Sequence, residues 1–186
     1  MQMGDNTAHV YDPNMIKHKQ HFLYPGTVFA RMEPHHITTV LGSCIAVCLW
    51  DQKRRIGGMN HFLLPEQIGD DVLTPRYGDI AISHLLQRML NLGSKREDLV
   101  AKMFGGAAVL QIVTPNLSVG SRNIQMAYDI LKQEKIRVIS KDVGGSSGRK
   151  IMFNTYTGTV RVKTLQETVF VENYRMSPQE KGDRQK

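Results

Sequence analysis

The pattern of apolar and polar positions predicts strands at both ends of the chain and two helices between them. Alternating or continuously apolar runs bounded by turn residues are typical of strands, and a 3.6-residue apolar period is typical of an amphipathic helix. The helical period is clear over 79–92 and over roughly 120–134, with Gly93 expected as a C′ residue and Ser121 as an N-cap. Strands are expected at 27–33, 36–41, 44–50, 56–64, 99–104, 137–143, 149–156, 159–165 and 168–171.

This order of elements lacks the regular strand–helix alternation of a doubly wound fold. We therefore expect an α+β fold, a layered α/β sandwich with mixed or antiparallel sheets covered by two helices. A chain of 186 residues is most simply one domain. We place that domain at 23–171, between a flexible N-terminal arm at 1–22 and a disordered C-terminal tail at 172–186.

Composition and charge narrow the class of protein further. The net charge of +7 comes from scattered basic residues that aromatic residues do not interleave, which argues against nucleic-acid binding. The longest apolar run, 44–50, is too short to cross a membrane, so no membrane insertion is expected. The first residues are too polar for an export signal, and two cysteines make no disulfide framework. We therefore expect a cytoplasmic protein with reduced thiols.

Candidate chemistry lies in the stretch from residue 38 to residue 65, where a cysteine follows a Gly-Ser turn and the second expected strand bears a histidine. If 44–50 and 56–64 form a hairpin centred between Gln52 and Lys53, Cys44 lies directly opposite His61 on one face of the sheet. A shift of one residue would put the two side chains on opposite faces. The spacing therefore predicts a thiol–imidazole pair.

Such a pair suits nucleophilic catalysis, because an imidazole can take the proton of a thiol and generate the reactive thiolate. A third group usually orients the imidazole, and the hydroxyls of Thr38 and Thr39 are near in sequence. Ser43 and Asn60 flank the pair. Each of them either helps to form an oxyanion site or only satisfies local backbone groups.

Structural interpretations compete with each of these assignments. A cysteine in an apolar strand is commonly inert packing, a role that also suits Cys48. A metal site built from Cys44, Cys48 and His61, with His35 or His36, is disfavoured because C-x3-C is not a usual zinc spacing. Phe104, before two glycines, is either a partner-facing aromatic residue or a core residue.

The motifs together resemble one family, the CheD chemoreceptor glutamine deamidases. The similarity covers roughly residues 25–165, most of the expected domain. It is carried by TTVLGSCIAVCLWD (38–51), GGMNHFLLP (57–65), RYGDIAI (76–82), AKMFGGA (101–107), SRN (121–123) and DVGGSSGRKI (142–151).

The resemblance implies a cysteine hydrolase that converts glutamine side chains of chemoreceptors to glutamate and releases ammonia through a thioester, without cofactor or metal. It implies Cys44 as nucleophile, His61 as base and Thr38 as the third member. It also implies the layered sandwich of related toxin deamidases. The expected partners are the cytoplasmic helices of chemoreceptors and a CheC-type phosphatase. A non-catalytic adaptor that binds these partners, and a protease or transglutaminase with the same pair, remain alternatives.

Overall fold

A computed structural model describes residues 17–66, 74–108 and 118–165 of the chain. The expected strand at 168–171, residues 1–16 of the expected arm and the expected tail at 172–186 lie outside these ranges. The elements are β1 (Lys19–Phe22), β2 (Thr27–Arg31), β3 (His35–Leu41), β4 (Ile45–Asp51), β5 (Ile56–His61), α1 (Gly78–Asn91), the 3₁₀ helix η2 (Arg96–Asp98), β6 (Leu99–Gly105), α2 (Val119–Gln133), β7 (Arg137–Val143), β8 (Arg149–Asn154) and β9 (Val160–Thr164).

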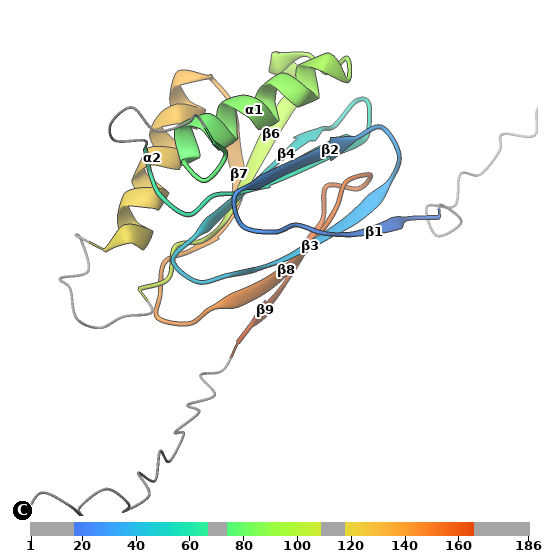
Figure 1. The fold of residues 1–186 in the computed structure, drawn as a ribbon. Coiled ribbons are helices and arrows are strands. Elements are labelled where there is room, and N and C mark those ends of the chain that lie inside the picture. Colours follow the sequence, from blue (N-terminus) through green and yellow to red (C-terminus); the bar gives the residue numbers. More distant parts are fainter. Residues whose placement is uncertain (1–16, 67–73, 109–117, 166–186) are drawn as a thin grey trace, which may run out of the picture.

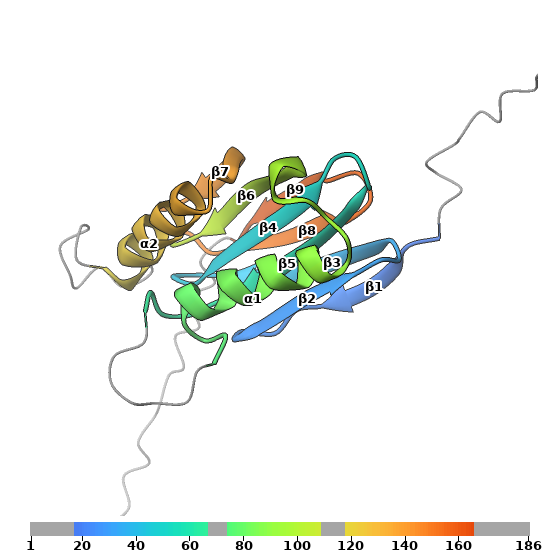
Figure 2. The ribbon, with the colours of Figure 1, turned by 90° about the horizontal axis from the view of Figure 1, so that it is seen from above.

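The strands form two sheets that lie face to face (Figure 1). The four-stranded sheet has the order β1-β3-β8-β9, and the five-stranded sheet has the order β2-β5-β4-β6-β7. Each sheet is mixed, since β1 runs parallel to β3 and β6 runs parallel to β7. Both helices pack on the five-stranded sheet, as the view from above also shows (Figure 2). The expected α+β sandwich is thereby confirmed.

Two apolar layers hold the sandwich together. One lies between the two sheets, and the other lies between the five-stranded sheet and the helices. The continuously apolar β4 is buried on both faces because it contributes to both layers. The layer between the sheets contains Leu23, Ile37, Leu41, Ala46, Cys48, Met59, Phe104, Ile151 and Phe153.

The helical periods in the sequence located α1 and α2 to within one residue at each end. Of the two capping residues predicted, one is confirmed and one was wrong. Gly93 has φ of +89° and follows the C-cap of α1, which confirms it as the C′ residue. The N-cap of α2 is Ser118, whose side chain accepts the N–H of Ser121 at 3.1 Å. The prediction of Ser121 as N-cap was wrong, because the helix begins at Val119 and Ser121 lies inside its first turn. Among the described residues, no helix is long and apolar enough to cross a lipid bilayer.

Two strands differ from the expected pattern. Residues 19–22, assigned to the arm, form the edge strand β1, in which Gln20 pairs with His36 and Phe22 with Thr38. Backbone hydrogen bonds hold this parallel pair, so the side-chain pattern gave little sign of it. β5 ends at His61, three residues earlier than expected, and further on the N–H groups of residues 63 and 64 bond to the carbonyl oxygen of Arg76.

Candidate active site

The hairpin of β4 and β5 has a four-residue turn at 52–55, with Asp51 paired to Ile56. The Asp51 carboxylate closes this turn, since its Oδ1 accepts the N–H groups of Lys53 at 3.0 Å and Arg54 at 2.9 Å. Arg55 takes a φ of +54° and donates its N–H to the Asp51 carbonyl at 2.9 Å. The predicted centre between residues 52 and 53 was wrong by one position, because the Asp51 carboxylate closes a turn that begins at residue 52.

This turn sets the register of the pair at the candidate site. Cys48 pairs with Met59 and Ile45 bridges to Phe62, a register by which His61 lies opposite Ala46. Cys44, two residues before Ala46, is therefore a diagonal neighbour of His61. The expected direct opposition is corrected to this diagonal arrangement. A shift of two residues keeps both side chains on one face, the face toward the four-stranded sheet.

His61 is buried between the two sheets, with 1% of its surface exposed. The side chain that contacts its ring is that of Thr39. Nδ1 of His61 lies 2.8 Å from Oγ1 of Thr39, and the same hydroxyl donates to the carbonyl oxygen of Leu23 at 2.7 Å. A hydroxyl carries one hydrogen, so a group that donates to Leu23 must accept from the ring. These contacts assign the proton to Nδ1 and leave the lone pair on Nε2. Nε2 is buried and has no hydrogen-bond partner among the described residues.

Burial sets the protonation of both groups. It lowers the pKa of His61 to about 4, against a smaller raising effect of the Leu23 backbone. Burial also raises the pKa of the half-buried Cys44 thiol above its ordinary value, and a hydrogen bond from its own backbone N–H opposes that rise. Both groups are therefore neutral at neutral pH. The resting site therefore holds a thiol and a neutral imidazole on one face of the sheet rather than a thiolate and an imidazolium.

The turn at 42–44, which carries the candidate nucleophile Cys44, is held by the chain after β6. The N–H of Gly106 donates to the carbonyl of Cys44, and the N–H of Ala107 donates to the carbonyl of Gly42, both at 2.8 Å. Gly105 has φ of +107°, and a Cβ atom there would lie 2.1 Å from the Cys44 carbonyl oxygen. Only glycine fits this approach without displacing the nucleophile turn.

Thr38, expected to orient His61, lies on the other face of β3. Its neighbours Ile37 and Thr39 are fully buried toward the five-stranded sheet, whereas Thr38 is only half buried. Successive side chains of a strand point to opposite faces, so one residue separates the expected contact from the observed one. The structure thus gives the hydrogen bond to Thr39, which sequence reasoning had considered but not selected.

The remaining candidates, Asn60, Phe104 and Ser43, bond to nearby backbone or lie partly or fully buried. Oδ1 of the fully buried Asn60 accepts the N–H of Val47 at 2.9 Å, and as the neighbour of His61 in β5 it points to the opposite face. Phe104 is 3% exposed in the layer between the sheets, so its ring is not offered to a partner. Ser43 is half buried within the nucleophile turn. Within the described ranges, no group of three or more His, Cys, Asp and Glu side chains is placed to hold a metal ion.

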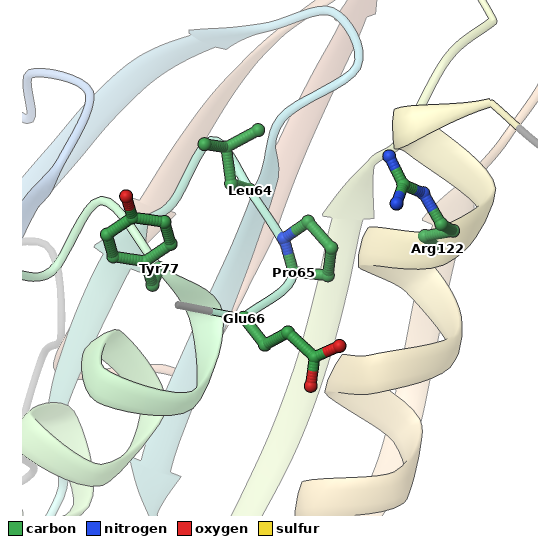
Figure 3. A pocket seen from close by; sticks show the side chains of 5 residues that line it. All are labelled: Leu64, Pro65, Glu66, Tyr77 and Arg122. Carbon is green, nitrogen blue, oxygen red and sulfur yellow. The ribbon is translucent and has the colours of Figure 1, made fainter. Parts of the chain in front are cut away.

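A separate groove lies on the helix side of the molecule. It has a volume of about 180 Å³ and lies between the chain after β5 and the start of α2 (Figure 3). A larger hollow of about 420 Å³ shares three of its residues and continues along α2. Leu64, Pro65, Glu66, Tyr77 and Arg122 line the first part.

The fold is an α+β sandwich that places a thiol and an imidazole on one face of a sheet, at the seam with a second sheet. Residues 63–164 match the family described as CheD chemotactic sensory transduction. The chain belongs to the CheD family.

Relatives from three bacteria carry the same printed name, "probable chemoreceptor glutamine deamidase CheD". The chain is 49% identical to that of Trichlorobacter lovleyi, over 76% of this chain and 88% of the relative. It is 42% identical to that of Sulfurimonas denitrificans, over 83% of this chain and 100% of the relative. It is 45% identical to that of Rhodospirillum rubrum, over 84% and 89% respectively.

Proposed function

We propose that this chain is a chemoreceptor glutamine deamidase, which hydrolyses glutamine side-chain amides of chemoreceptors to glutamate and ammonia. Membership of the CheD family supports this substrate class. The observation that carries the chemistry is the oriented His61, whose Nε2 lone pair is free of any described partner on the face that also bears Cys44.

In the first half-reaction, Nε2 of His61 takes the proton of the Cys44 thiol as the sulfur attacks the carboxamide carbon. A new carbon–sulfur bond forms, and the carbonyl π electrons move to oxygen. The imidazolium then returns its proton to the amide nitrogen while the carbon–nitrogen bond breaks. Ammonia leaves, and the glutamine side chain is held as a thioester on Cys44.

In the second half-reaction, Nε2 takes a proton from water as the water oxygen attacks the thioester carbon. The carbon–sulfur bond then breaks, and the leaving sulfur recovers a proton from the imidazolium. The product is a glutamic acid side chain, which ionises at neutral pH, and the site returns to its resting state. No cofactor enters either step.

The surroundings support both steps. Thr39 accepts a hydrogen bond from Nδ1–H throughout, which keeps the ring in one orientation and stabilises the transient imidazolium. The backbone N–H of Cys44 lies close to its own sulfur, and we assign it as a donor to the oxyanion that develops next to that sulfur. In this assignment Ser43 contributes through the shape of the turn, while Asn60 only satisfies the backbone of β4.

The substrate segments are then the cytoplasmic helices of chemoreceptors, which places the reaction in the cytoplasm. A CheC-type phosphatase is a second proposed partner, supported by the family resemblance of the sequence.

The test incubates the protein with a cytoplasmic chemoreceptor fragment and maps the products by peptide mass spectrometry. The wild type should convert specific glutamines to glutamates, whereas Cys44→Ala and His61→Ala should not. Cys48→Ala is the matched thiol control and should stay active. Full conversion by Cys44→Ala would contradict the proposal. Tight binding of the fragment without conversion by the wild type would favour a non-catalytic adaptor, and peptide cleavage or amine incorporation would indicate a protease or transglutaminase.

A further inference from the structure

Asn123 is a fully buried polar residue in the second turn of α2, and it links the helix layer to both strands of the catalytic hairpin. Its Nδ2 donates to the carbonyl oxygen of Ser43 at 3.0 Å and to that of Leu63 at 2.9 Å. Ser43 immediately precedes the nucleophile Cys44, and Leu63 lies two residues after the base His61. One amide group therefore holds the two chain segments that carry the proposed reacting groups.

The surroundings determine which way this amide points. Both of its neighbours are carbonyl oxygens, so the nitrogen must face them, with each amide hydrogen serving one carbonyl. The Oδ1 atom is buried and has no partner among the described residues. An unpaired buried acceptor is unfavourable for folding. The unpaired Oδ1 therefore offsets part of the stability that Asn123 contributes to the fold. Its Nδ2, in contrast, is bonded to both carbonyl oxygens.

The helix that carries Asn123 is a firm support. Gly120 sits so close to the chain after β6 that an added Cβ atom would lie 2.5 Å from the carbonyl oxygen of Gly106. Further along α2, Ala127 and Leu131 are fully buried in the layer beneath the helices. The amide thus projects from an element that cannot easily follow a movement of the nucleophile turn.

We infer that Asn123 is a positioning residue, which fixes the distance and orientation of the Cys44 turn relative to the His61 strand. This inference rests on the proposed roles of Cys44 and His61. It assigns to α2 a part in the reaction although α2 lies on the opposite side of the five-stranded sheet from the thiol. Without the amide, the Ser43 carbonyl would lose its link to α2, and the turn would keep the Ile45–Phe62 bridge and its bonds to the turn after β6. The Ser43–Cys44 peptide would then be freer to rotate, and the thiol would shift relative to Nε2.

The test compares Asn123→Ala and Asn123→Asp with Leu131→Ala, a variant of the same helix that loses core packing but keeps both carbonyl contacts of Asn123. Asn123→Asp nearly keeps the shape of the side chain but replaces the two donors with an acceptor. All variants are assayed well below their unfolding temperatures. The measurements are kcat and KM for deamidation, and the rate of Cys44 alkylation by iodoacetamide across a pH range.

Both Asn123 variants should lose kcat by roughly ten- to a hundredfold, because a small displacement of reacting groups has a large effect on rate, while KM changes little. Their Cys44 should alkylate faster, with a thiol pKa nearer its ordinary value, because the released turn exposes the sulfur. Leu131→Ala should match the wild type in both measurements. Asn123→Ala behaving like Leu131→Ala would overturn the inference. The alkylation arm requires no deamidase activity, so it decides the positioning role even where the proposed function fails.

Discussion

The hydroxyl of Thr39 and Nδ1 of His61 lie 2.8 Å apart across the seam between the two sheets. Because the same hydroxyl gives its hydrogen to the carbonyl of Leu23, it can only accept from the ring. Together, this pair of contacts fixes the tautomer and the orientation of the imidazole. It also makes Nε2, the nitrogen without a described partner, the basic atom of the site.

Paired substitutions at neighbouring threonines test this relationship. Thr39→Val should lower kcat for deamidation roughly ten- to a hundredfold, since the ring loses the acceptor that orients it. Thr39→Ser keeps the hydroxyl and should retain most of the activity. Thr38→Val, one residue away on the opposite face of β3, is the matched control and should behave like the wild type. A large loss in Thr38→Val with an active Thr39→Val would show that the observed hydrogen bond has no catalytic role.

The pH dependence of stability should carry the signature of the buried His61. Its pKa falls from the ordinary 6.5 to about 4, so between these values the unfolded chain binds a proton that the folded chain does not. The free energy of unfolding should therefore be lost as pH falls from about 6.5 to about 4, by roughly 3 kcal/mol from this site. Above pH 6.5 the contribution is complete and constant.

Urea unfolding at a series of pH values measures this effect, with His61→Gln as the comparison. The difference in slope between the two proteins isolates His61 from the other histidines. The acid limb of kcat/KM should likewise lie near pH 4 rather than near 6.5, because only the neutral ring can take the thiol proton. Equal slopes for wild type and His61→Gln would show that His61 titrates normally in the folded protein.

The two cysteines should differ sharply in alkylation by iodoacetamide. Cys44 is half buried, while Cys48 is fully buried and its thiol pKa is strongly raised by burial. In the folded protein only Cys44 should react, slowly at neutral pH and faster as pH rises, because its resting form is the thiol. Intact-mass spectrometry should show one modification when folded and two in urea. Rapid modification at pH 6 would instead indicate a preformed thiolate.

Two glycines in the left-handed region provide a matched test of the nucleophile turn. Gly105→Ala would place a Cβ atom 2.1 Å from the Cys44 carbonyl, so it should cost roughly 2–4 kcal/mol of unfolding free energy and most of the activity. Gly144 also has a positive φ, but no atom lies within 4 Å of the carbon that Gly144→Ala would add. It should cost only about 1–2 kcal/mol of backbone strain and leave kcat unchanged. Thermal unfolding and the deamidation assay together check both outcomes.

The sequence was a good guide where side-chain periodicity determines structure. Both helices, most strands and the layered fold follow from apolar patterning, because each element buries one or both faces. Edge strand β1 was missed because backbone hydrogen bonds, rather than apolar side chains, hold it to β3. The apolar pattern of a sequence says least about an exposed edge strand such as β1, which pairs in parallel with its neighbour.

At the candidate site, the sequence predicted correctly that Cys44 and His61 share one face of the sheet, but the predicted hairpin register was wrong. Cys44 and His61 do share a face, but the Asp51 carboxylate closes a turn at 52–55, and the resulting register makes them diagonal neighbours. The choice between Thr38 and Thr39 depends on which face of β3 meets the second sheet, and the sequence of an isolated strand with two adjacent threonines does not specify it. The burial of Phe104 follows from the same sheet-to-sheet contact.

The seam between the sheets has one more consequence. His61 belongs to the five-stranded sheet, while its orienting hydroxyl belongs to the four-stranded sheet, so the site exists only while the two sheets keep their mutual alignment. A sliding of one sheet over the other by a fraction of a residue would separate the ring from its acceptor without breaking either hydrogen-bonded ladder. Catalytic rate is then a more sensitive gauge of sheet docking than secondary structure, and in mild denaturant we expect activity to decline before the circular dichroism signal changes.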